Sequence, residues 1–75
     1  MKAILTKYIG PTDFRGARIK AWDMDGNSVT VSYPYEMNQE ERHRFAANAL
    51  RLKMKWHADI VGGAIKGGYA FVFVK

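Results

Sequence analysis

One segment of the chain has the composition of a long helix. Residues 39–55 contain no glycine or proline, and Asn38 precedes them with Glu41 three positions later, which is the pattern of a helix N-cap with a capping box. We therefore expect one helix from about Gln39 to Lys55. On both sides of this segment apolar and polar residues alternate, which is the period of β-strands. Strands before and after a single helix restrict the chain to a small set of α+β folds.

The expected strands are separated by turn residues. Gly10 to Gly16 is rich in turn formers and predicts a loop of some length, and Asp25-Gly26 predicts the tip of a hairpin between two antiparallel neighbours. The last strand is apolar on both alternating faces, which indicates the interior of the sheet, or one face under the helix and the other under a second subunit. The expected strands are Lys2 to Ile9, Ala17 to Trp22, Ser28 to Tyr33, Asp59 to Ile65 and Tyr69 to Val74.

The predicted architecture is a single α+β domain over residues 1–75. It has one antiparallel sheet in the order β-β-β-α-β-β, with the helix packed on one face. Because the chain has no cysteine, its stability must come from packing or from self-association. A homodimer is a candidate, since one helix cannot cover both sheet faces. At about 100° per residue, the apolar arc of the helix predicts these core residues: Phe45, Ala46, Ala49, Leu50, Leu52 and Trp56.

Basic residues are the main functional signal of the sequence. Twelve Lys and Arg against seven Asp and Glu give a net charge of +5, which favours polyanionic partners. Arg18, Lys20 and Trp22 share the outer face of the second expected strand, and Arg15 lies in the loop before it. Lysine and arginine contact phosphates, and a neighbouring aromatic ring stacks on the bases of a single strand. The alternative is a solvated basic face on which Trp22 only caps the sheet.

A second basic group follows the expected helix. Between Arg42 and Lys55 there are five Lys or Arg residues and no acidic residue, and three of them recur at intervals of seven and four along one exposed stripe. We expect the structure to tolerate the loss of this stripe. The predicted partner-binding residues are Arg15, Arg18, Lys20, Trp22, Arg44, Arg51 and Lys55. The predicted function is low-specificity binding of single-stranded DNA or RNA, without catalysis.

No set of residues in the sequence supports an enzyme, a cofactor or a metal site. His43 and His57 are too far apart along the helix to share a metal, and we expect both at the surface or near helix ends. Asp23 and Asp25 alternate as calcium ligands can, but the glycine and the glutamate that an EF-hand loop requires are out of place. No serine has a candidate base. Catalytic, cofactor-binding and metal-binding residues are therefore all predicted to be absent.

The segment Gly68-Tyr69-Ala70-Phe71-Val72-Phe73 resembles the aromatic strand of the RNA-recognition motif, in which exposed rings stack on bases. Here Gly67 stands where that family has Lys or Arg, and Val74 stands where it has its last aromatic residue. The order of elements also differs, because that family continues with a helix and a strand. We therefore expect a core strand rather than a base-stacking surface.

The chain as a whole resembles small uncharacterised basic proteins encoded by phages and mobile elements. The resemblance is carried by Met1-Lys2-Ala3-Ile4, by Arg15-Gly16-Ala17-Arg18-Ile19-Lys20-Ala21, by Lys53-Met54-Lys55-Trp56 and by the closing Gly67–Phe73 segment. It implies binding to host or phage macromolecules. The alternative function is thus a protein inhibitor of a host defence or nucleic-acid-processing complex. We expect a cytoplasmic location, that of the host cell for a phage protein, because no apolar run approaches about 20 residues.

Overall fold

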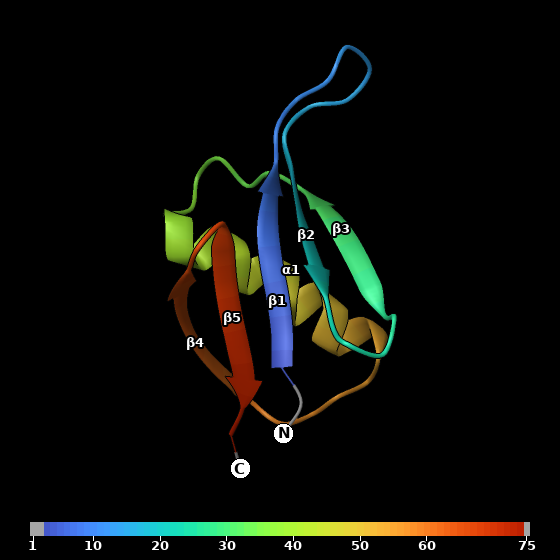
Figure 1. Ribbon diagram of the computed structural model, residues 1–75, viewed down its shortest axis with the longest axis vertical. Coiled ribbons are helices and arrows are strands. Elements are labelled where there is room, and N and C mark those ends of the chain that lie inside the picture. The colour runs from blue at the N-terminus through green and yellow to red at the C-terminus, as the bar shows by residue number, and fades with distance from the viewer. Residues whose placement is uncertain (1–2, 75) are drawn as a thin grey trace.

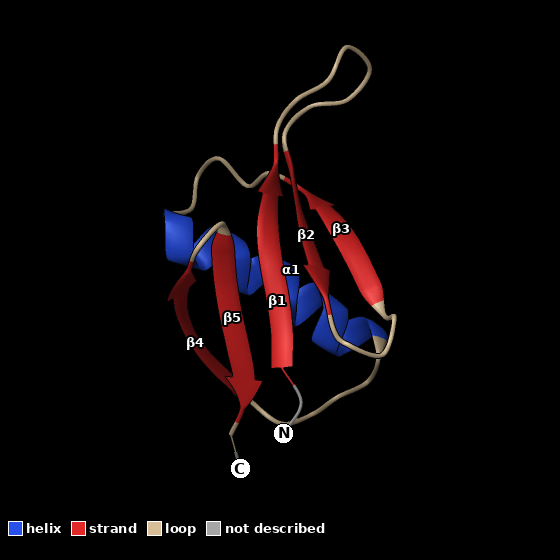
Figure 2. Ribbon diagram, viewed as in Figure 1, coloured by secondary structure: helices blue, strands red, loops and turns tan. Residues whose placement is uncertain are grey.

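Five strands form one antiparallel sheet, and one helix crosses one of its faces (Figures 1 and 2). The computed structural model describes residues 3–74. Its elements are β1 (Ala3–Ile9), β2 (Arg18–Trp22), β3 (Ser28–Ser32), α1 (Gln39–Lys53), β4 (Ile60–Ile65) and β5 (Gly68–Phe73). The strands lie in the order β3-β2-β1-β5-β4. The predicted α+β class and the order β-β-β-α-β-β are confirmed.

The turn between β2 and β3 is built on one carboxylate. Asp23 Oδ1 accepts hydrogen bonds from the backbone N–H groups of Asp25 (3.0 Å) and Asn27 (2.9 Å), and Asp23 Oδ2 accepts one from Asn27 Nδ2 (2.9 Å). Gly26 has φ +93°, a left-handed conformation that glycine adopts without strain. The predicted hairpin tip is therefore confirmed, and the Asp23 carboxylate holds the turn together.

The helix begins where the capping pattern predicts. Asn38 Oδ1 accepts a hydrogen bond from the Glu41 N–H (2.9 Å), and Glu41 Oε1 accepts one from the Asn38 N–H (3.1 Å). The helix ends at Lys53, two residues before the predicted end, because Lys55 has φ 60° and turns the chain away from the helix axis. Within residues 3–74, no helix has the length and apolar character needed to cross a membrane.

The core lies between α1 and one face of the sheet. The helix contributes small side chains, chiefly Ala46 and Ala47, which let its backbone approach the sheet closely. The fully buried apolar residues are Ile4, Ile19, Ala21, Ala46, Ala47, Leu50 and Phe71. Phe45 and Leu52, which the apolar arc places in the core, are instead 44% and 73% exposed. That expectation is wrong because the large core side chains come mainly from the strands.

The buried face of the helix includes His43, which the sequence predicts to lie at the surface or near a helix end. His43 is 1% exposed, and its Nδ1 lies 2.8 Å from the hydroxyl oxygen of Thr6, which is also 1% exposed. The His43 ring packs against the ring of Tyr69 with 4.6 Å between centroids. Burial lowers the pKa of His43 below its ordinary value. His43 is therefore a core residue with a hydrogen-bond partner.

The helix leaves the other face of the sheet uncovered, and we call this the open face (Figure 2). Cross-strand pairing places Leu5 and Lys7 of β1 opposite Trp22 and Lys20 of β2, all on this face. On the β5–β4 side the same face carries small and apolar residues, namely Val61, Ile65, Ala70 and Val72. The open face thus has a basic half over β1 and β2 and an apolar half over β4 and β5.

Candidate nucleic-acid interface

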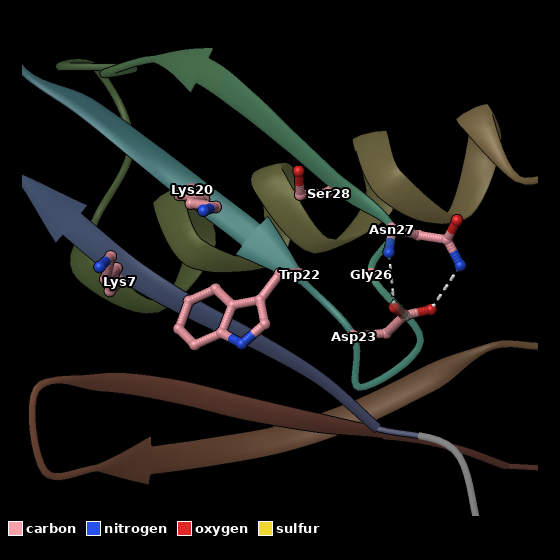
Figure 3. A pocket seen from close by; sticks show the side chains of 7 residues that line it. All are labelled: Lys7, Lys20, Trp22, Asp23, Gly26, Asn27 and Ser28. Carbon is pink, nitrogen blue, oxygen red and sulfur yellow. Dashed lines mark hydrogen bonds between the residues drawn. The ribbon is translucent and has the colours of Figure 1, made fainter.

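The basic half of the open face contains two lysines and a tryptophan from neighbouring strands. Lys7 and Lys20 are direct cross-strand partners, and Trp22 follows Lys20 by two residues, so strand alternation puts all three on one face. The Lys7 ammonium lies 5.8 Å from the centre of the Trp22 ring, within the range of a cation–π interaction. Figure 3 shows the indole ring lying across β1, near the side chain of Lys7.

These three residues line a shallow depression of about 410 Å³ at the end of the β2–β3 hairpin. Asp23, Gly26, Asn27 and Ser28 complete its lining. Asp23 is the one acidic residue among them, and its carboxylate accepts the hydrogen bonds that hold the turn. Lys7 and Lys20 form no salt bridge within the described residues. Because like charges on opposed strand positions repel one another, an anion bound between them would be stabilised.

Arg18 lies on the open face at the start of β2, and Arg15 lies in the loop between β1 and β2. This loop, residues 10–17, extends beyond the sheet as a long arm in Figure 1. Arg15 lies in the arm and is exposed, and Arg18 begins β2 at the base of the arm. Of the predicted residues, Arg18, Lys20 and Trp22 thus share the open face of β2, and Arg15 lies in the arm that precedes them.

The predicted helix stripe lies apart from these residues, since α1 packs on the opposite face of the sheet. Arg44 Nη1 donates a hydrogen bond to the Ile60 carbonyl oxygen (2.9 Å), and its guanidinium lies 5.4 Å from the centre of the Phe71 ring. Arg51 Nη1 donates to the Ala58 carbonyl oxygen (2.8 Å). Lys55 is exposed. Two of the three stripe residues thus attach the helix to the chain that enters β4, which contradicts the expectation of a freely exposed stripe.

Sequence reasoning did not select Lys7 as a binding residue. The alternation of β1 already puts the Lys7 side chain on the face away from the buried residues. Only the register between β1 and β2 shows that Lys7 is the cross-strand partner of Lys20. The RNA-recognition-like strand is a core strand, as expected, because Phe71 is fully buried under α1. Within residues 3–74, no group of three or more His, Asp or Glu side chains is placed to hold a metal ion.

No protein-family model, curated protein sequence or solved structure matches this chain. Function therefore has to be argued from the geometry and charge of the open face.

Proposed function

We propose that this protein is a non-catalytic binding protein for single-stranded DNA or RNA, of low sequence specificity, that uses the basic half of its open face. The observation that carries the proposal is the grouping of Lys7, Lys20 and Trp22 on an uncovered sheet surface. Lysine ammonium groups neutralise phosphates without reading sequence, and an indole ring stacks on any unpaired base. Bases inside a duplex are already stacked, so this combination favours a single strand.

The proposal uses the strand residues rather than the helix stripe. Arg18 and Arg15 continue the basic surface from Lys20 toward the arm, in line with the predicted set. Arg44 and Arg51 are engaged in hydrogen bonds to backbone carbonyl oxygens, so they add to the net positive charge more than to a contact surface. Lys55 lies two residues beyond the end of α1 and is exposed, and its part in binding stays a prediction.

Binding to a short oligothymidine strand, measured by fluorescence anisotropy at several salt concentrations, tests the proposal. Trp22→Ala should weaken binding by about 1–3 kcal/mol, the usual contribution of one base stacked on an aromatic ring. Replacing Lys7 and Lys20 together with Gln should reduce the salt slope by about 1.4, because each neutralised phosphate of a single strand contributes about 0.7.

Lys66→Gln is the matched control for these variants. Lys66 is an exposed lysine in the turn between β4 and β5, so its replacement removes one positive charge without touching the Trp22 depression. It should leave the affinity close to that of the unchanged protein. The absence of binding at low salt, or an equal loss of affinity in Lys66→Gln and in the Lys7 and Lys20 variant, would refute the proposal.

A second candidate function is inhibition of a host defence or nucleic-acid-processing complex by direct protein contact. The apolar half of the open face favours it, because Val61 and Ile65 are each 47% exposed and a phosphate backbone makes no use of such side chains. The test is a pull-down from a nuclease-treated host lysate. Capture of the same host protein by the unchanged protein and by Trp22→Ala, but not by Val61→Lys, would support this function over the first. Phage origin and the homodimer stay predictions.

A further inference from the structure

A second depression, of about 430 Å³, lies at the base of the arm on the β3 side. It is lined by the two arginines of the arm and its base and by the segment that leaves β3. Its lining residues are Arg15, Gly16, Ala17, Arg18, Ser32, Tyr33 and Tyr35. None of them is acidic. This depression is separate from the one lined by Trp22, since the two share no residue.

Arg18 has an unsatisfied donor here. Its Nε is buried and has no hydrogen-bond partner among the described residues. Neither Arg15 nor Arg18 forms a salt bridge within residues 3–74. A buried N–H group without an acceptor is costly, and an ionised donor more so. Nothing within residues 3–74 accepts this proton, so an anion toward which the Arg18 guanidinium turns would supply the missing acceptor.

The walls of this depression are held in place by hydrogen bonds. On the β3 side, Arg42 Nε donates to the Pro34 carbonyl oxygen (3.0 Å) and Arg42 Nη2 donates to the Tyr35 carbonyl oxygen (2.8 Å). The Arg42 guanidinium also lies 4.4 Å from the centre of the Tyr33 ring. Arg42 therefore fixes the wall opposite Arg18 without lining the depression itself.

The arm side is ordered as well. The Thr12 N–H donates to the Arg15 carbonyl oxygen (2.8 Å), and the Arg15 N–H donates to the Thr12 hydroxyl oxygen (3.1 Å). At the base of the arm, the Tyr33 N–H donates to the Ala17 carbonyl oxygen (3.1 Å) and ties the arm to the chain beyond β3. These hydrogen bonds fix the backbone of the arm and of its base, while the exposed Arg15 side chain keeps rotamer freedom that a bound ligand would reduce.

We propose that this depression binds a phosphate group, held by the guanidinium groups of Arg18 and Arg15. The planar fork of a guanidinium matches two phosphate oxygens, so Arg18 would donate through Nε–H and one Nη–H. The site rests on the proposed function and deepens it, because it assigns one phosphate group to a defined depression. That phosphate is inorganic phosphate or belongs to the terminus or backbone of a nucleic-acid strand. The ring of Tyr35, which is 69% exposed, lies beside it for contact with an attached base.

Arginine side-chain N–H resonances in a ¹H–¹⁵N spectrum test the site directly. Titration with inorganic phosphate should shift the Arg18 Nε–H signal in a saturable way. The Nε–H signals of Arg42 and Arg51 are internal controls and should stay in place, because these groups already donate to Pro34 and Asn48. Arg18→Lys should weaken binding about tenfold, since an ammonium group cannot make the two-pronged contact.

Oligothymidine with and without a 5′ phosphate identifies the source of the ligand. A shift of the Arg18 Nε–H signal on addition of inorganic phosphate or of either strand supports the site. The site is overturned if this signal moves with none of these three ligands, or if it moves equally in sodium chloride of matched ionic strength. The indole N–H signal of Trp22 reports the proposed function in the same spectra, so the two ideas fail separately. Arg15→Gln, a change in the exposed arm, is the second variant should Arg18→Lys not fold.

Discussion

The hydrogen bond between Thr6 and His43 gives the most direct test of how the core is held together. Both residues are 1% exposed, and the Thr6 hydroxyl oxygen and His43 Nδ1 lie 2.8 Å apart. Thr6→Val preserves the shape of the side chain, so no cavity forms and the change isolates the loss of the hydroxyl. His43 Nδ1 would then be buried without a partner, which costs about 1–3 kcal/mol.

For a domain of this size, each kcal/mol lowers the melting temperature by about 4–8 °C. Thermal and urea unfolding of Thr6→Val, followed by circular dichroism, should therefore show a clear loss of stability. Thr30→Val is the matched control, because Thr30 is an exposed residue on the open face of β3. If the free energy of unfolding of Thr6→Val differs from that of the unchanged protein by less than about 0.5 kcal/mol, the hydrogen bond between Thr6 and His43 makes no net contribution to stability and the reasoning is refuted.

Local patterns in the sequence were sufficient to predict the elements and their order. Alternation of apolar and polar residues marks β2 and β3, the Asn38–Glu41 capping box marks the start of α1, and Asp25-Gly26 marks the hairpin. Each of these signals depends on residues within a few positions of one another. These signals can be recognised without knowing which distant segments of the chain are in contact, so the sequence alone predicts the α+β architecture.

The rotation of the helix and the position of the binding residues depend instead on contacts between distant segments. Leu52 is exposed because strands far away in sequence fill the core beneath α1, and apolarity alone does not show which side of the helix they meet. Likewise, Arg44 and Arg51 find their acceptors in the chain that enters β4. Lys7 gains its place beside Trp22 only through the register of β1 and β2.

Two further predictions follow from the helix contacts. Arg51→Gln should cost about 1 kcal/mol of stability in urea unfolding, because it removes the charged hydrogen bonds to the Ala58 carbonyl oxygen and to Asn48 Oδ1 and the ion pair with Asp59 (3.7 Å) at a partly exposed site. Lys55→Gln should cost less than about 0.5 kcal/mol. Equal effects would contradict the structural role of Arg51. The second prediction concerns pH. Burial lowers the pKa of His43 below 6.5, so the unfolded chain binds a proton more readily than the folded protein. Stability should therefore be complete at about pH 7.5 and should fall as the pH drops below the unfolded pKa toward the folded one. His43→Gln should flatten this dependence on the acid side of neutrality, above the pH range of most carboxylate titrations. A pH dependence of stability as steep in His43→Gln as in the unchanged protein would show that the buried imidazole is not its source.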